Sequence, residues 1–134
     1  MGAHFRLFAL VSSARDTGSG RTEARLLARH LAYWQQVLAP IEHARVRYTI
    51  FGGEVLRERF AELQCPLLVE EPERERGRGY YTGAALRITA GDTELGDGGF
   101  TTWTAQMRAD AKERCLISCI SIDRLSGPAP GEQG

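Results

Sequence analysis

The stretch RGRGYYTGAALRI, residues 76–88, places two arginines and two glycines ahead of paired tyrosines and a predicted strand. Glycine lets a backbone approach a ligand closely. Arginine offers a planar fork of donors that suits carboxylates and phosphates, and tyrosine gives a flat wall with a polar tip. The stretch therefore indicates a binding site for an anionic ligand. A Gly-rich turn that leads into an edge strand is the structural alternative, and composition alone leaves both interpretations open.

The length and composition of the chain point to one globular domain. The 134 residues include 17 Lys and Arg and 17 Asp and Glu, so the formal net charge is zero. A neutral chain argues against a strong non-specific nucleic-acid footprint, which needs a basic face. The three cysteines lack CxxC spacing, which argues against a disulfide scaffold or zinc site, and Cys115 and Cys119 are expected to be buried free thiols. No signal peptide or membrane span is visible, and the cytoplasm is the expected location.

Apolar spacing on both sides of the opening stretch predicts alternating strands and helices. The longest helix carries an inward row that is expected to bury against the sheet, and Ala39-Pro40 is expected to end it. Gly-rich and polar segments over 12–20 and 91–99 are expected to be turns. The predicted strands cover 4–11, 44–51, 66–69, 80–89 and 115–122, and the predicted helices cover 22–38, 54–63 and the part of 100–114 that follows a turn at 101–102. The inward row is Leu26, Leu27, Leu31, Trp34 and Leu38.

Three short motifs, in order, resemble the class II aminoacyl-tRNA synthetases. Arg-Gly, two residues, then Tyr-Tyr-Thr-Gly resembles the histidine-binding signature of histidyl-tRNA synthetases and their non-catalytic paralogues. The stretch HFRLF at 4–8 resembles the second strand of motif 2, and CISIDRL at 119–125 resembles motif 3. The resemblance implies an α/β (α+β) fold with a mainly antiparallel sheet and helices on one face. It implies a core fragment over 1–125, and the Pro- and Gly-rich residues 126–134 are expected to be a disordered tail.

The resemblance also implies the site. Arg76 would stabilise negative charge during amino-acid activation, and His4 and Arg124 would contact ATP, with magnesium as a possible companion. Tyr80 and Tyr81 would form the substrate wall, and strand alternation predicts that only one of them faces the ligand. The ligand is expected to be anionic or amino-acid-like. No protein-bound metal is expected.

The departures from the family pattern point to a degenerate domain. Leu10 and Ala14 stand where a glutamine and a glutamate would hold substrate, and Gly79 replaces an aspartate. Cys119 and Ser121 stand where motif 3 usually has glycines. The sequence begins inside motif 2, without motif 1 or the first motif 2 strand, and no anticodon-binding domain follows Leu125.

The expected function is therefore a histidyl-tRNA synthetase-like domain that binds a nucleotide or small amino-acid-like ligand, or acts as a regulatory or interaction module. The alternative is a residual ATP-dependent enzyme that activates a carboxylate when a partner chain completes it. An autonomous synthetase is not expected. A half core would leave a sheet edge uncovered, so self-association as a two-fold dimer, or a partner protein, is expected.

Other catalytic patterns are weaker. The sequence has no GxSxG, Walker loop or HExxH. His30 falls in the long helix and is interpreted as a surface or hydrogen-bonded structural histidine. Asp92, Glu94 and Asp97 lack EF-hand spacing and are interpreted as turn residues.

Overall fold

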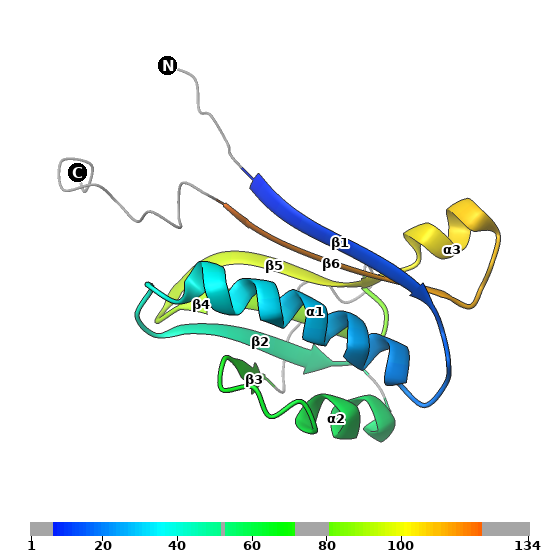
Figure 1. Cartoon of the computed structure of the whole chain (residues 1–134), viewed down its shortest axis with the longest axis horizontal. Helices are drawn as coiled ribbons and strands as arrows, with labels where there is room; N and C mark the ends of the chain where they lie inside the picture. Colours follow the sequence, from blue (N-terminus) through cyan, green and yellow to red (C-terminus); the bar gives the residue numbers. More distant parts are fainter. Residues whose placement is uncertain (1–6, 52, 72–80, 122–134) are drawn as a thin grey trace, which may run out of the picture.

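A computed structural model of the chain describes residues 7–51, 53–71 and 81–121 (Figure 1). These residues form one six-stranded sheet in the order β1-β6-β5-β4-β2-β3. The strands are β1 (Leu7–Arg15), β2 (Ala44–Ile50), β3 (Leu68–Glu70), β4 (Ala84–Ala90), β5 (Thr93–Thr101) and β6 (Glu113–Ser121), and the helices are α1 (Arg21–Leu38), α2 (Glu54–Ala61) and α3 (Trp103–Arg108).

The predicted mainly antiparallel sheet is confirmed. Neighbouring strands pair antiparallel everywhere except β2 and β3, which run parallel. A parallel pair needs a crossover connection, and α2 supplies it. None of the helices in the described residues is long and apolar enough to cross a membrane.

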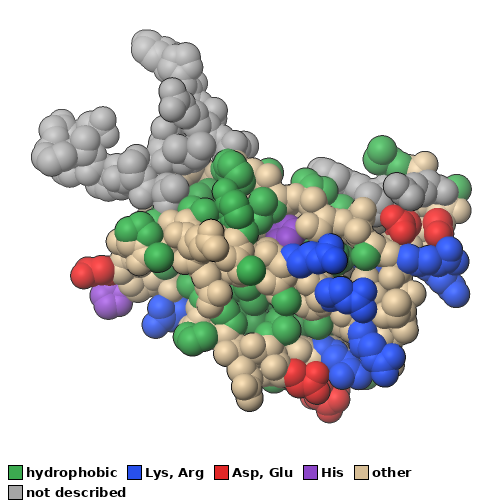
Figure 2. Space-filling view, viewed as in Figure 1, with side chains coloured by type: hydrophobic (Ala, Val, Ile, Leu, Met, Phe, Trp, Pro, Cys, Tyr) green, Lys and Arg blue, Asp and Glu red, His purple; other side chains and the backbone are tan. Residues whose placement is uncertain are grey.

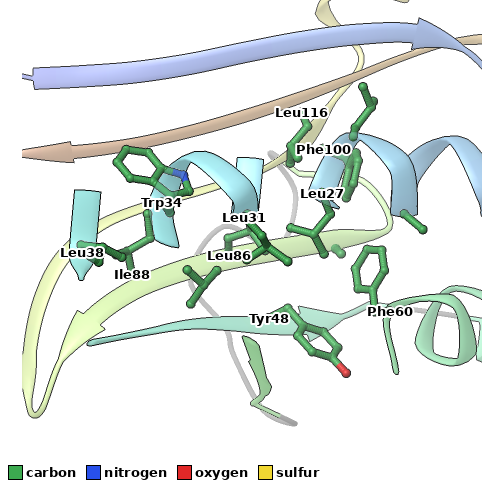
Figure 3. Close-up of a cluster of buried hydrophobic side chains, with 14 of the residues drawn as sticks. Leu27, Leu31, Trp34, Leu38, Tyr48, Phe60, Leu86, Ile88, Phe100 and Leu116 are labelled. Atoms are coloured by element: carbon green, nitrogen blue, oxygen red, sulfur yellow. The ribbon is translucent and has the colours of Figure 1, made fainter. Parts of the chain in front are cut away.

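The long helix α1 lies across one face of the sheet, as its apolar spacing predicts (Figure 1). All five residues of its predicted inward row are buried, with exposed fractions of 3% or less. Figure 3 shows four members of this row pointing toward side chains of β4 and β6: Leu27, Leu31, Trp34 and Leu38. Its sheet partners include Val46, Leu86, Ile88, Leu116 and Ile120, which belong to the same buried cluster. The helix ends at Leu38, directly before Ala39-Pro40, as expected.

The second helix extends the core toward β2. Phe60 is buried, and its ring makes an edge contact with Tyr48 at 5.3 Å between centroids and a stacked contact with Phe100 at 6.2 Å. Aromatic pairs at these separations are favourable beyond the area that they bury. Helices α1 and α2 therefore cover the same face of the sheet.

The turn predicted over 91–99 is wrong for most of its length. Only Gly91 and Asp92 form a turn, with Gly91 at φ +60°, and β5 begins at Thr93. The glycines of β5 are needed for close approach rather than for chain reversal. A Cβ on Gly98 would overlap the Ile117 carbonyl oxygen, and a Cβ on Gly99, at φ +156°, would lie 2.5 Å from the Tyr81 ring.

Three other predicted boundaries also move. Residues 12–15, predicted as turn, belong to β1, because Ser12 and Ser13 pair with Leu116 and Cys115 of β6. The strand predicted from 80 begins instead at Ala84, and 81–83 form a bend before it. The helix predicted to run toward residue 112 ends at Arg108, where Ala109 takes a left-handed conformation.

Candidate ligand-binding site

A cavity of about 290 Å³ opens at one end of the sheet, beside the second half of the Tyr-Tyr-Thr-Gly motif. Four elements and the motif meet there: the first turn of α1, the end of β5, α3 with its following turn, and the start of β6. The lining residues are Glu23, Thr82, Gly83, Phe100, Thr101, Thr102, Ala105, Ala111, Glu113 and Arg114.

Backbone hydrogen bonds fix the motif's place in the wall. The Thr82 amide donates to the Phe100 carbonyl at 2.8 Å, and the Phe51 amide donates to the Gly83 carbonyl at 2.9 Å. Gly83 has φ +80°, a conformation that glycine adopts without strain. The Thr-Gly pair thus ties the start of β4 to the end of β5 through Thr82 and to the residue that follows β2 through Gly83.

Tyr81 lies in a bend rather than in the strand predicted for it. Its half-buried ring packs against the backbone of Gly99, and it is not among the cavity-lining residues. The alternation argument does not apply to it, because Tyr81 lies in the bend before β4 rather than in a strand. The substrate contact assigned to Tyr81 stays a prediction.

A charged group closes the cavity on the α1 side. The Arg114 guanidinium lies 3.0 Å from the Asp16 carboxylate through Nη2 and 3.4 Å from Glu23 Oε2 through Nε. The second Glu23 oxygen, Oε1, is buried and has no hydrogen-bond partner among the described residues. A buried acceptor without a donor is costly. Glu23 is also one of the residues that line the cavity, so its carboxylate is a candidate partner for a ligand donor.

Glu23 is the site residue that the sequence interpretation missed. An acidic residue in the first turn of a helix is ordinary, because it complements the helix dipole. The available signal was that Glu23 is the only acidic residue of α1, whereas the exposed side of the helix carries Arg21, Arg25 and Arg29. Figure 2 shows Lys and Arg side chains gathered over the N-terminal half of this helix.

The two positions where the family places polar substrate contacts face the core here. Leu10 and Ala14 are half-buried and pack against the apolar cluster under α1. Ser12, between them in the same strand, contacts His30 of α1. At these positions β1 contributes to the packing of the core.

His30 is a hydrogen-bonded structural histidine, but a buried one. Its Nδ1 lies 2.7 Å from Ser118 Oγ, which also accepts a hydrogen bond from Trp34 Nε1 at 2.8 Å. Its Nε2 lies 3.1 Å from Ser12 Oγ. Burial lowers the pKa of His30 to about 4, so the ring is neutral at physiological pH. It does not line the cavity.

The sheet face opposite α1 carries a polar row that crosses four strands. Arg47, Arg87, Asp97 and Cys119 occupy paired positions of β2, β4, β5 and β6. Arg87 donates to both Glu71 oxygens, at 3.1 and 2.5 Å, and its Nη1 lies 3.5 Å from Glu94.

These contacts shift the acid–base properties of the row. The hydrogen bond to Glu71 is the main cause of the raised pKa of Arg87. Burial raises the pKa of the Cys119 thiol, which lies 3.8 Å from Asp97. Its thiolate is therefore disfavoured. Both predicted thiols are free, with Cys115 buried and Cys119 half-buried.

Three acidic residues around the start of β5 are interpreted from the sequence as turn residues rather than as cation ligands: Asp92, Glu94 and Asp97. Asp92 lies in the turn before β5, whereas Glu94 and Asp97 lie in the strand itself. In 7–51, 53–71 and 81–121, no group of three or more His, Cys, Asp or Glu residues is placed to hold a metal ion.

The remaining predicted site residues are His4, Arg76, Tyr80 and Arg124. All four lie outside the residues that the structure describes. Their assigned roles stay predictions.

Comparison with known proteins supports the predicted fold. No family model and no curated protein matches the chain. Among solved structures, apo histidyl-tRNA synthetase of S. aureus matches with a TM-score of 0.63 and 21% sequence identity. The match covers 91% of this chain and 39% of the S. aureus chain, so this chain spans less than half the length of that protein. The chain thus has a class II synthetase-like fold.

Proposed function

We propose that this chain is a synthetase-like domain that binds a small amino-acid-like ligand in the cavity beside Thr82 and Gly83. The observation that carries the proposal is the buried Glu23 Oε1, which lacks a partner among the described residues. A ligand ammonium group would supply the missing donor, and hydrogen bonds to a charged group are stronger than neutral ones. Thr82 and Thr102 add hydroxyl groups to the wall, and Phe100 adds an apolar surface.

The size of the cavity favours a small ligand. Its volume of about 290 Å³ is close to the lower limit for small-molecule sites, which span roughly 300–1,000 Å³. The described residues do not fit a triphosphate there, because Arg114, the cation of the lining, is already paired with Asp16 and Glu23. ATP contacts would rest on His4 and Arg124, and no nucleotide or magnesium step is derived from the cavity.

The test compares free amino acids with their N-acetyl forms by titration calorimetry. Acetylation removes the ammonium charge, so we expect the free amino acid that binds best to lose at least about tenfold in affinity when acetylated. Glu23→Gln should cause a similar loss. Glu42→Gln removes the same charge at an exposed site and should have no effect. Equal binding by Glu23→Gln and the unaltered chain would reject the proposal.

Activity tests separate this function from its alternative. The purified chain should show no amino-acid-dependent exchange of pyrophosphate into ATP. Such exchange would assign it instead to carboxylate activation. In that case Arg124→Ala should abolish ATP binding, as the resemblance to motif 3 implies.

A further inference from the structure

The outer edge of β1 is long and carries little charge. β1 is the terminal strand of the sheet, and no strand within the described part of the chain pairs with its outer side. Its nine residues, LFALVSSAR, carry a single charge, at Arg15. Natural sheets protect an exposed edge with charges, prolines, bulges or short strands. The pairing of β1 with β6 is continuous over all nine residues, so no bulge interrupts this edge.

The side chains of β1 also leave apolar surface exposed. Val11 is 59% exposed and Phe8 is 39% exposed, and both are among the few large hydrophobic side chains that the described surface leaves open. In Figure 2 hydrophobic side chains gather at the top of the view, where β1 begins. Because side chains alternate along a strand, Phe8 lies on the α1 face and Val11 on the opposite face, so both sides of this open edge carry exposed apolar surface.

The opposite edge of the sheet is protected in the expected way. β3 has three residues, and Glu70 at its end pairs with Arg57 at 2.7 Å. A strand this short offers few backbone groups to a partner. Of the two edges, β1 is therefore the one that offers a long row of backbone groups to a partner strand.

We propose that β1 pairs antiparallel with β1 of a second copy of this chain, around a two-fold axis at Val11. In that register Val11 lies opposite Val11 of the second copy, Ala9 lies opposite Ser13, and Leu7 lies opposite Arg15. The exposed apolar side chain at the centre of one β1 strand thus lies opposite the same side chain of the other, and no like charges of the two strands face each other. Both features favour this pairing. Because the two surfaces are identical, the contact closes as a dimer.

The α1 side of the edge fits the same register. Phe8 stacks on Tyr33 with ring centroids 5.5 Å apart, so its large ring is held above the sheet. The register sets Phe8 opposite Ala14 of the second copy, and it pairs Leu10 with Ser12. A large side chain thus meets a small one at each of these positions. The two six-stranded sheets would join into one continuous sheet.

Light scattering from about 1 to 100 μM tests the dimer. The unaltered chain should be dimeric at the upper end of this range. Val11→Lys sets two ammonium groups opposite each other at the axis and should weaken the dimer at least tenfold. Met107→Lys adds the same charge at a side chain that is 84% exposed on α3, and it should remain dimeric. Circular dichroism checks that both variants are folded.

Cysteine cross-linking tests the register. Val11→Cys places two thiols at the axis, within the separation that a disulfide spans. Ser13→Cys places its two thiols four residues apart along the paired strands, about 14 Å, which is too far to bond. Oxidation should cross-link the first variant efficiently and the second no more than the unaltered chain. A chain that stays monomeric, a dimer that survives Val11→Lys, or equal cross-linking of the two variants would overturn the proposal.

Discussion

Leu86 and Arg87 are neighbours in β4, yet they lie on opposite faces of the sheet. Leu86 is fully buried in the cluster under α1 and α2, whereas Arg87 joins the polar row with Glu71 and Glu94. The α1 face gains stability from apolar burial and one enclosed hydrogen-bond network. The opposite face relies on half-buried ion pairs. Most of the large apolar side chains are therefore buried on the α1 face, and the ion pairs of the polar face are expected to contribute less to stability.

The largest expected effect is on the α1 face. Leu86→Ala leaves a cavity in the centre of the sheet and should lower the free energy of unfolding by about 2–5 kcal/mol. Urea denaturation with an unchanged m-value would measure it. A loss below about 1 kcal/mol would mean that the cluster under α1 is less tightly packed than its burial indicates.

A pH titration of stability probes the enclosed network. His30 has its pKa lowered to about 4 by burial, whereas an unfolded histidine titrates near 6.5. Between these values the unfolded chain binds the proton and the folded chain does not. The folded state therefore loses stability as pH falls from 6.5 to 4, by up to about 3 kcal/mol.

The control for this pH effect is the variant His30→Gln. Its side chain keeps polar atoms that can form hydrogen bonds, but it does not bind a proton in this pH range. The stability difference between the unaltered chain and the variant should change across this window and stay constant above pH 7. Parallel pH profiles would contradict a buried neutral histidine. Ser12, Ser118 and Trp34, its hydrogen-bonding neighbours, carry no charge.

A smaller loss of stability is expected when the Ser118 hydroxyl, which contacts both His30 and Trp34, is removed. Ser118→Ala removes the acceptor of Trp34 Nε1 and the partner of His30 Nδ1, and should cost about 1–3 kcal/mol. Thermal unfolding compares it with Ser12→Ala, which removes only the longer contact to Nε2. Equal losses in the two variants would show that Trp34 gains nothing from Ser118.

The smallest effect is expected on the polar face. Arg87→Gln breaks the pairs with Glu71 and Glu94, but about a third of the Arg87 side chain is exposed. The loss should be about 1 kcal/mol at low ionic strength and less in 1 M salt, because salt screens exposed charges. Urea denaturation at two salt concentrations measures both values. A loss as large as that of Leu86→Ala would erase the distinction between the faces.

The periodic spacing of apolar residues in the sequence explains why the bounds of some helices and strands could be predicted. Helix α1 and strand β2 lie within one residue of their predicted bounds because one face of each faces the core. The error at β5 has a tertiary cause: Gly98 and Gly99 stay in a strand because β6 and the Tyr81 ring approach closely. Local rules treat such glycines as breaks, and no local signal reveals the neighbour.

The candidate site was harder to predict than the fold. Thr82 and Gly83 of the Tyr-Tyr-Thr-Gly motif line the cavity, whereas Tyr81, which the resemblance assigns to the substrate wall, does not. Glu23 joins it only through the packing of α1 against the start of β6, a contact between residues about 90 positions apart in sequence. Motif spacing carries no information on such a pair.

The pairing of β1 with β6 has a consequence for how the protein is made. Leu7 pairs with Ser121, so the first described strand can complete this pairing only after the last described strand has been synthesised. Until then β1 has both edges open and resembles an aggregation-prone segment that chaperones recognise. Contacts this distant in sequence also slow the search for the folded state, and refolding from urea should take milliseconds to seconds rather than microseconds.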